Sequence, residues 1–441
     1  MLELKPLELP PMAGRDAALA HAIVDSVLQR WITLGFLLDK FLAQPMHMLQ
    51  PPIKGPLLVG AAQILLLDRI PAYAAINHAV EWAKRNVRPG AGGLVNAVLR
   101  KVAALRLLGD QSLAPIQYAG ERDAIPLPSG HCLKLSGLVL PEDRDHRLSV
   151  ATGLPKAVLL MIEQQHGKQY TMPQAMHTVQ RPPVVLNTQF APPDSLPMEV
   201  LIAHQQPGFH VYAGGHEQLV SMLQSRDDVW AQDASSGNTV QTLAKLKPKR
   251  IIDLCAGQGT KTRQLAKTFP HAKIIATDND IKRLAVLEKV FIGSENVEVM
   301  PIERVFAEAN KAKHQADLVL LDVPCSNTGV LARRPEAKYR FSDQTVEELV
   351  VLQQSIIVDA AHVLSDKPGA TLVYSTCSVD ARENLQQAQF AAKELGLSIT
   401  SHQQLLPTGH PQPETLRSGE APASLTTTYR DGAFVAVLTR L

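Results

Sequence analysis

The feature that most constrains the fold is an alternation of short apolar strands with amphipathic helices that begins after Lys245. β-Branched residues mark the predicted strands, and apolar residues three and four apart mark the predicted helices. The predicted strands are RIIDLCAG at 250–257, AKIIATDND at 272–280, ADLVLLDVPC at 316–325 and ATLVYSTCS at 370–378. Helices are predicted at 260–269 and 346–364, the second with capping-box spacing at Thr345 and Glu348. This alternation predicts an α/β domain with a mostly parallel, doubly wound sheet and helices on both faces.

Two other regions precede the predicted sheet. Helical periodicity between residues 13 and 106 predicts an all-α bundle, whereas the charged, aperiodic stretch 107–150 is interpreted as connecting structure. The bundle helices are predicted at 17–31, 56–70, 72–86 and 92–106. A helix at 154–167 and strands at 183–190 and 208–212 predict a small α+β unit.

These patterns predict a multidomain chain with three parts. Residues 1–140 form the helical domain with its connecting segment, 141–235 the small α+β domain, and 236–441 the α/β domain.

Composition narrows the class of protein. Hydrophobic residues make up 45% of the 441 residues and charged residues 20%, which is typical of a globular chain and excludes a disordered one. Its four cysteines are too few for a disulfide framework, no apolar run is long enough to span a membrane, and the N-terminus lacks a secretion signal. We therefore expect a soluble, cytoplasmic protein. The net charge of +2 neither favours nor excludes a nucleic acid partner.

A glycine turn follows the first predicted strand of the α/β domain. Ligands of doubly wound sheets bind beyond the carboxyl ends of the strands, where DLCAGQGTKT (253–262) places Gly257 and Gly259. Asp278 ends the second strand, where a carboxylate can accept hydrogen bonds from ribose hydroxyls. Either a plain tight turn or a nucleoside cofactor site explains this pattern. Because the turn matches neither the dinucleotide-binding fingerprint nor the P-loop, S-adenosylmethionine is the cofactor that fits best.

Two more strand ends carry cysteines. LDVPCSNTG places Asp322 and Cys325 after one strand, and VYSTCSVD places Cys377 after another, so both thiols should lie at one sheet edge. A buried cysteine is ordinarily an inert apolar side chain, but two thiols at strand ends beside a carboxylate are harder to explain in that way. Metal binding is disfavoured because the spacing of zinc ligands is absent. Cys132 lies outside this group and is interpreted as structural.

Three segments resemble motifs of the RNA cytosine-5 methyltransferases of the Sun/Fmu/NSUN superfamily, especially the small-subunit (16S) ribosomal RNA enzymes. They are DLCAGQGTKT, LDVPCSNTGVLARRPEAKY and VYSTCSVDAREN. The N-terminal segments PLLVGAAQILLLDRIPAYAAINHAVEWAKR and GGLVNAVLRKV are similar to the NusB antitermination-factor domain. WAQDASSG at 230–237 and DGAFVAVLTRL at 431–441 also match the superfamily. The resemblance implies a NusB-like bundle, a small α+β domain and a Rossmann-like class I methyltransferase domain.

The resemblance also implies roles for the strand-end residues. Cys377 of the Thr-Cys motif is the family's nucleophile, which adds to C6 of cytosine so that C5 can accept the methyl group. Cys325 of the Pro-Cys motif assists product release. Asp322 hydrogen-bonds the cytosine ring edge and lies near the methionine end of the cofactor.

Cofactor residues carry over from the same resemblance. They are Cys255, Ala256, Gly257, Gln258, Gly259, Thr260, Lys261, Asp278, Glu303 and Asp322. The family's usual turn A-P-G-G-K-T is altered here, and we expect altered affinity with binding retained. Glu303 stands for an acidic residue near the adenine, in a register that the sequence does not fix.

RNA is the expected partner, with no metal, no membrane and no oligomer required. Arg333, Arg334, Lys338 and Tyr339, directly after the Pro-Cys motif, are predicted to hold phosphates and stack a base, the alternative being a solvated charged loop. The helical domain has a second candidate basic face: Lys84, Arg85, Arg88, Arg100, Lys101 and Arg106.

Two other functions remain open. One is the same chemistry on tRNA, and the other is a non-catalytic RNA-docking factor in ribosome assembly or transcription.

Overall fold

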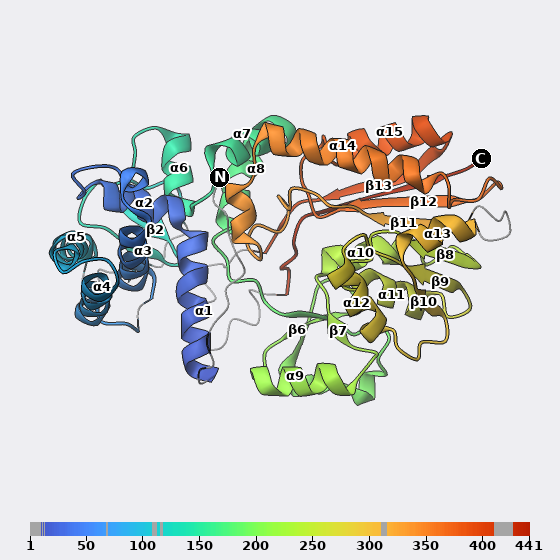
Figure 1. Ribbon diagram of the computed structural model, residues 1–441, viewed down its shortest axis with the longest axis horizontal. Helices are drawn as coiled ribbons and strands as arrows, with labels where there is room; N and C mark the ends of the chain where they lie inside the picture. The colour runs from blue at the N-terminus through green and yellow to red at the C-terminus, as the bar shows by residue number, and fades with distance from the viewer. Residues whose placement is uncertain are drawn as a thin grey trace. The chain divides into compact units, whose positions relative to one another are not determined.

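The computed structural model describes residues 10, 12, 14–67, 69–107, 113–114, 118–309, 315–409 and 427–441. These residues form two compact units, coloured along the chain in Figure 1. The first unit contains the described residues up to Arg181 together with Leu331–Arg340. The second contains Pro182–Val330, Phe341–Gly409 and the described residues from Thr427 onward.

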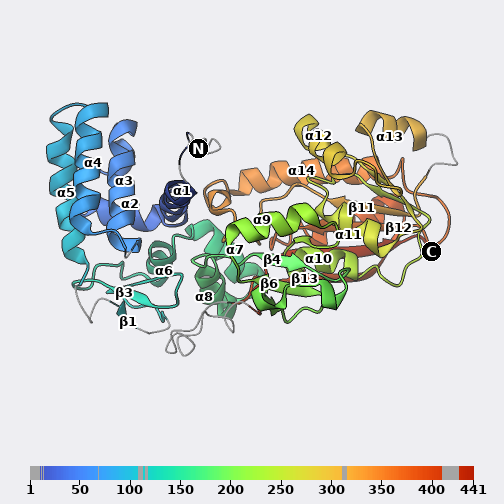
Figure 2. The same ribbon diagram turned by 90° about the horizontal axis from the view of Figure 1, so that it is seen from below.

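The first unit is mainly helical. Its helices are α1 (Gly14–Gln29), α2 (Trp31–Asp39), α3 (Pro51–Leu66), α4 (Ala72–Asn86), α5 (Ala91–Leu105), α6 (Arg144–Thr152), α7 (Lys156–His166) and α8 (Lys168–His177). A small antiparallel sheet has the order β1 (Leu113–Ala114), β3 (Cys132–Lys134), β2 (Ala124–Pro126). Helices α3, α4 and α5 lie side by side in Figure 2. Gly60 permits this close packing, because a Cβ there would lie 2.5 Å from a methyl carbon of Leu99.

Part of the stretch interpreted as connecting structure is helical. Helix α6 begins at Arg144, and Asp143 caps it by accepting a 2.8 Å hydrogen bond from the backbone N–H of His146. The run of charged residues that was interpreted as a connection therefore includes the N-cap of this helix. Leu148 and Val150 lie on its buried face.

The second unit contains a seven-stranded sheet in the order β10-β9-β8-β11-β12-β14-β13. Its strands are β8 (Arg250–Asp253), β9 (Lys273–Ala276), β10 (Val297–Val299), β11 (Leu318–Asp322), β12 (Thr371–Thr376), β13 (Ser398–Leu405) and β14 (Ala433–Thr439). The five neighbouring strands β10, β9, β8, β11 and β12 are parallel, and β14 pairs antiparallel with both β12 and β13. The predicted mostly parallel sheet is thus confirmed, with an antiparallel hairpin at one edge.

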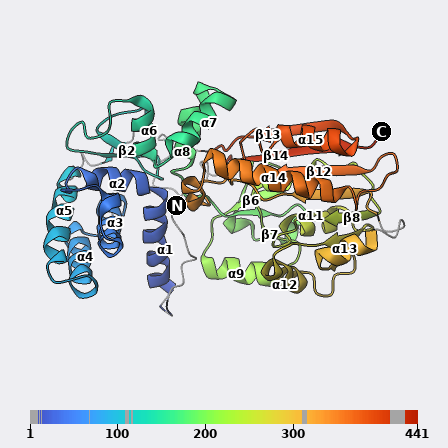
Figure 3. The same cartoon turned by 45° about the horizontal axis from the view of Figure 1, so that its top comes forward.

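Helices cover both faces of this sheet, as a doubly wound fold requires (Figures 1 and 3). One layer consists of α10 (Ala234–Gln241), α11 (Thr260–Thr268) and α12 (Ile281–Val290), and the other of α13 (Ile302–Ala309), α14 (Asp343–Ala360) and α15 (Leu385–Leu395). Alternate strand residues serve the two cores: Val319 packs against the α14 layer and Leu320 against the α11 layer.

Helix α14 starts earlier than the predicted capping box. Ser342 is the actual cap, and its hydroxyl accepts a 3.1 Å hydrogen bond from the N–H of Thr345. Ser342 and Thr345 are both residues that commonly cap helices, and they lie three residues apart. The sequence pattern alone did not show which of the two is the cap.

The small sheet belongs to the second unit. Its strand order is β5 (Leu201–Ala203), β6 (Phe209–Tyr212), β4 (Val185–Asn187), β7 (Trp230–Ala231). Helix α9 (His216–Ser225) lies between β6 and β7 in the chain. A Cβ on Gly237 of α10 would lie 2.2 Å from the Phe209 ring, so this sheet packs directly on α10. Asn187 donates to Gln232, which donates to Gln264 of α11, in a buried chain of two 2.8 Å hydrogen bonds. The small sheet and the seven-stranded sheet thus belong to one compact unit, which begins at Pro182.

No helix within the described ranges is long and apolar enough to cross a membrane.

Candidate active site

The glycine turn joins β8 to α11 at the carboxyl edge of the sheet. Gly257 and Gly259 have φ angles of +59° and +86°, a region that residues with a Cβ rarely adopt. The N–H of Gly257 donates a 3.0 Å hydrogen bond to Asp278, whose other carboxylate oxygen accepts from Asp280 N–H at 2.9 Å. A Cβ on Gly257 would meet nothing within 4 Å, so the backbone faces open space. An anchored carboxylate beside an exposed backbone turn fits the ribose of a nucleoside cofactor.

A second carboxylate lies beneath this turn. Asp253 ends β8, is 1% exposed, and accepts a 2.7 Å hydrogen bond from Thr262, while its Oδ1 has no partner among the described residues. Burial and the nearby charge of Asp322, opposed by the Thr262 hydrogen bond, raise the pKa of Asp253 to about 7. Asp253, Asp278 and Asp322 thus place three carboxyl groups around the turn.

Lys261 connects the glycine turn to Asp322, the carboxylate at the end of β11. Its Nζ lies 2.7 Å from Asp322 Oδ2, and Ser375 donates a 2.8 Å hydrogen bond to Asp322 Oδ1. Burial by itself would lower the pKa of Lys261, but the ion pair with Asp322 outweighs it and the pKa is raised. The ammonium therefore stays charged and fixes the position of the carboxylate.

The two strand-end cysteines are in contact. Cys325 follows β11 and Cys377 follows β12, and their sulfur atoms lie 3.2 Å apart. The hydrogen bond to Cys377, together with burial, raises the pKa of Cys325 well above the ordinary value of a thiol. Cys325 therefore remains a thiol and can donate to the sulfur of Cys377. The expectation that both cysteines meet at one sheet edge is confirmed.

Residues without a predicted role hold this pair in place. Glu383 is fully buried and accepts four hydrogen bonds, from Ser326 N–H and Oγ, Ser378 Oγ and Gln353 Nε2. Ser326 and Ser378 are the chain neighbours of the two cysteines, so one carboxylate fixes both loops. Glu383 lies within the VDAREN segment, shortly after a predicted strand. Its position there was the one feature of the sequence that could have pointed to a role at this site.

Asn327 also supports the cysteines. It adopts a φ of +61°, donates to the carbonyl of Cys325 at 2.9 Å and accepts a 3.3 Å hydrogen bond from Cys377 Sγ. The adjacent Gly329 leaves no room for a side chain, because a Cβ would lie 2.6 Å from the carbonyl oxygen of Gly432.

A cavity of about 100 Å³ opens beside the nucleophile candidate. Lys261, Asp322, Cys377 and Asp431 line it, together with Ser235 at the start of α10. The cavity therefore brings a thiol, a carboxylate and the ammonium of Lys261 to one small space.

The residues predicted to contact RNA are divided by burial. Arg333 and Arg334 are exposed, and the hydroxyl of the half-buried Tyr339 donates to the carbonyl of Leu28 at 2.6 Å. Lys338 is 0% exposed, with its Nζ 3.3 Å from the carbonyl of Gln29. The expectation that Lys338 contacts phosphate is wrong for this structure, because the residue lies within a short 3₁₀ turn, Pro335–Tyr339, that packs on α1.

Other predicted residues have simpler environments. Glu303 is exposed in the first turn of α13, directly after β10, and Gln258 is exposed at the tip of the glycine turn. Cys132 is buried, and burial raises its pKa to about 11. Burial likewise raises the pKa of Cys255 well above the ordinary thiol value.

The candidate basic face of the helical domain is mostly exposed. Its exposed members are Lys84, Arg85, Arg88, Arg100 and Lys101. Lys84 pairs with Glu81 at 2.8 Å, and Arg106 is half-buried and donates to the carbonyl of Ile64 at 3.0 Å. Within the described part of the chain, no group of three or more His, Cys, Asp or Glu side chains is placed to hold a metal ion.

Comparison with known proteins identifies both ends of the chain. Residues 240–439 match the family "16S rRNA methyltransferase RsmB/F", and residues 2–104 match the NusB family. Ribosomal RNA small subunit methyltransferase B of Klebsiella pneumoniae subsp. pneumoniae is 31% identical over 395 residues, covering 87% of this chain and 84% of the relative. The same enzyme of Escherichia coli O6:K15:H31 is 30% identical over 412 residues, covering 92% and 88%.

Solved structures share the fold. PH0851 matches with a TM-score of 0.67 at 18% identity, covering 97% of this chain and 90% of that one. NSun6 from Pyrococcus horikoshii matches with a TM-score of 0.51 at 17% identity, covering 65% and 98%. The sequence relatives and the matched family together show that the chain belongs to the RsmB/F family of S-adenosylmethionine-dependent 16S rRNA methyltransferases.

Proposed function

We propose that this enzyme methylates C5 of a cytosine in 16S rRNA and that Cys377 is the nucleophile. The observation that carries the proposal is the 3.2 Å contact between Cys325 and Cys377 beside Asp322. C5 of cytosine is a poor nucleophile, so a reaction there needs a thiol that can first add to C6.

The proposed reaction begins with attack by the sulfur of Cys377. A bond forms between Sγ and C6, the S–H bond breaks as its proton passes to N3, and the electron pair of the C5–C6 double bond shifts onto C5. The Asp322 carboxylate accepts hydrogen bonds from the ring edge and so favours the N3-protonated form of the base. Lys261 and Ser375 hold Asp322 in this orientation.

S-Adenosylmethionine, when bound at the glycine turn, supplies an electrophilic methyl group. Gly257, Asp278 and Lys261 are the residues proposed to bind and orient it, with the acidic residues Asp253 and Asp322 nearby. C5 would form the new bond to the methyl carbon as the methyl–sulfur bond breaks and its electron pair stays on the sulfur. C5 retains its proton until the last step.

Release of the product breaks the bond to Cys377. A solvent water molecule accepts the C5 proton, the C–H electron pair restores the C5–C6 double bond, and the sulfur leaves as a thiolate that then takes the proton from N3. The protonated Cys325 stabilises this thiolate by hydrogen bonding at the observed 3.2 Å contact. This gives the two cysteines different roles on the basis of their different environments.

The test measures transfer of labelled methyl from S-adenosylmethionine to protein-free 16S rRNA, with tRNA as a parallel substrate. We expect 5-methylcytosine in 16S rRNA and no label with the Cys377→Ala variant. Full transfer by Cys377→Ala would contradict the mechanism, and label on tRNA alone would contradict the substrate. Absence of cofactor binding would favour the RNA-docking alternative.

We further propose that the enzyme is cytoplasmic, because ribosomal RNA is transcribed in the bacterial cytoplasm, and that it acts as a monomer. Light scattering coupled to gel filtration tests the monomer.

A further inference from the structure

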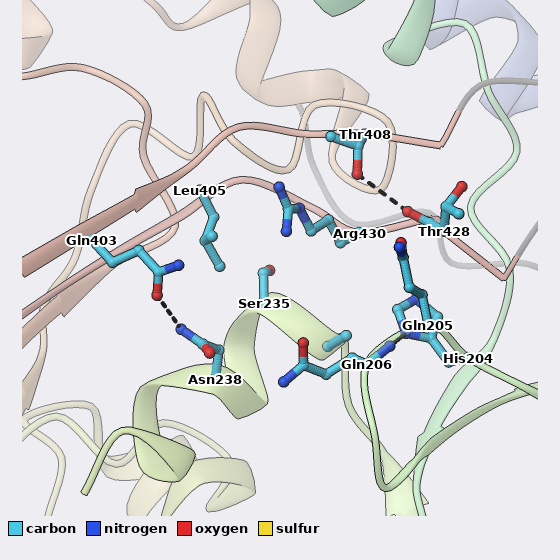
Figure 4. Close-up of a pocket in the computed structure, with 11 residues that line it drawn as sticks. His204, Gln205, Gln206, Ser235, Asn238, Gln403, Leu405, Thr408, Thr428 and Arg430 are labelled. Atoms are coloured by element: carbon cyan, nitrogen blue, oxygen red, sulfur yellow. Dashed lines mark hydrogen bonds between the residues drawn. The ribbon is translucent and has the colours of Figure 1, made fainter.

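A second, larger cavity lies in the same unit as the active site. Its volume is about 540 Å³, within the roughly 300–1,000 Å³ typical of small-ligand sites. The side chains that line it come from the 204–206 loop, α10, β13 and the segment before β14 (Figure 4). Four of them are amides: Gln205, Gln206, Asn238 and Gln403.

Arg430 supplies the charge of this cavity. Figure 4 shows its side chain reaching into the space between β13 and α10. No described residue forms an ion pair with Arg430, and its buried Nε has no hydrogen-bond partner among them. The described lining residues include no Asp or Glu. An unpaired guanidinium in a cavity without carboxylates favours an anionic ligand.

The walls of the cavity are held by hydrogen bonds. His204 Nδ1 accepts from Gln206 N–H at 2.9 Å, so Nε2 carries the proton and donates to the carbonyl of Tyr429 at 2.8 Å. Thr408 and Arg430 exchange backbone hydrogen bonds of 3.0 and 3.3 Å. The backbone that carries Arg430 is therefore fixed on both sides.

The amide side chains offer donors and acceptors in planar groups. Asn238 Nδ2 donates to Gln403 Oε1 at 2.9 Å, and Gln206 Nε2 donates to Gln241 Oε1 at 2.7 Å. Amides of this kind recognise the edges of nucleobases through paired hydrogen bonds. The lining thus combines groups suited to a phosphate and groups suited to a base.

This cavity and the catalytic cavity share a lining residue and a chain segment. Ser235 lines both cavities, and Arg430 precedes Asp431, which lines the catalytic cavity. Farther along the same segment, Gly432 donates to Gly329 at 2.8 Å, and Gly329 donates to the carbonyl of Cys377 at 2.9 Å. A polymer whose target base enters the catalytic cavity would place a neighbouring residue near Arg430.

We propose that the Arg430 cavity binds the nucleotide next to the target cytidine in single-stranded RNA. Arg430 binds the phosphodiester, and the amides of Asn238 and Gln403 contact the base. The proposal rests on the proposed function for the identity of the target, but it concerns RNA binding and can be tested without methyl transfer.

The experiment uses the full chain and a short, fluorescently labelled, single-stranded RNA with one cytosine. RNA Kd is measured by anisotropy at several salt concentrations for Arg430→Met, Arg430→Lys and the exposed control Lys393→Met. We expect Arg430→Met to weaken binding about tenfold and to lower the salt slope by about one. Arg430→Lys should retain the slope, and Lys393→Met should match the unaltered enzyme.

The base contact is tested with RNAs that carry an abasic residue on either side of the cytosine. An abasic neighbour on one side should weaken binding to the unaltered enzyme and have a smaller effect on Asn238→Ala. Affinity for S-adenosylmethionine should be unchanged in every variant, which shows that each has folded.

The outcomes separate this proposal from the proposed function. Loss of RNA affinity in Arg430→Met supports the subsite even if no RNA becomes methylated. Equal RNA affinity and salt slope for Arg430→Met, Lys393→Met and the unaltered enzyme would overturn the subsite while leaving methyl transfer intact. If Arg430→Met fails to fold, equal abasic sensitivity in Asn238→Ala and the unaltered enzyme would overturn it.

Discussion

Lys261 and Asp322, contributed by the glycine turn and by the end of β11, form a 2.7 Å ion pair. The pair joins the proposed cofactor turn to the carboxylate that lies beside Cys377 in the catalytic cavity. A movement of Lys261 would therefore displace the carboxylate of Asp322, and a movement of Asp322 would displace the ammonium of Lys261. This relationship makes Lys261 a positioning residue for Asp322 as well as a member of the cofactor turn.

Replacing Lys261 with Met should reduce methyl transfer by roughly one to two orders of magnitude, because Asp322 loses the charged hydrogen bond that orients it. Single-turnover kinetics with saturating RNA and cofactor measure this loss. Lys261→Arg should recover part of the rate, since it restores the charge with a different shape. A rate in Lys261→Met equal to that of Lys282→Met, an exposed control in α12, would contradict the positioning role.

Replacing Cys325 with Ala should trap RNA on the protein. Without the adjacent thiol, the sulfur of Cys377 is a poorer leaving group and the adduct at C6 should accumulate. Denaturing electrophoresis with labelled RNA and S-adenosylmethionine detects the adduct as a slow band. The band should be absent from the double variant Cys325→Ala, Cys377→Ala, and its persistence there would assign the covalent bond to another residue.

Replacing Glu383 with Gln should disturb both cysteine loops. The amide offers one oxygen where the carboxylate accepts four hydrogen bonds, so we expect a loss of about 1–3 kcal/mol in the free energy of unfolding. The turnover number should also fall while affinity for S-adenosylmethionine is retained, because the displaced groups lie beside the thiols. Denaturant unfolding and methyl-transfer kinetics check both effects against Glu394→Gln, an exposed control in α15.

Lys338 predicts a pH dependence of stability. Burial and the nearby Arg30 lower its pKa from 10.5 to about 7, so between these values the unfolded chain binds a proton that the folded chain lacks. The free energy of unfolding should therefore gain up to about 1.4 kcal/mol per pH unit from this group as the pH rises from 7 towards 10.5. Below pH 7 both states are protonated and the full cost of burying the charge remains.

The Lys338→Met variant should lose this contribution. The free energy of unfolding of Lys338→Met, minus that of the unaltered protein, should be larger at pH 6 than at pH 10, so the variant is relatively more stable at pH 6. The exposed control Lys101→Met should show no such trend. Urea unfolding across this pH range provides the measurement. Parallel pH profiles for the unaltered protein and Lys338→Met would show that Lys338 is not buried as described.

The sequence by itself determined the architecture of the catalytic domain and the identity of its strand-end residues. Periodicity is a local property of the chain, so the alternation of strands and helices was visible without coordinates. Parallel strands place their carboxyl ends at one edge, and this rule was sufficient to bring Asp322, Cys325 and Cys377 together.

Only the tertiary structure decided which side chains surround these residues. The contact of Glu383 with Ser326 and the pairing of Lys261 with Asp322 join side chains that are 57 and 61 residues apart and meet only after packing. Burial is also decided by packing. Lys338 is of a residue type that is usually exposed, but it is buried inside the first unit, whereas Arg333 is exposed. Local sequence specifies the direction and period of the backbone, and three-dimensional packing sets the distances, burial and charge environments on which the chemistry depends.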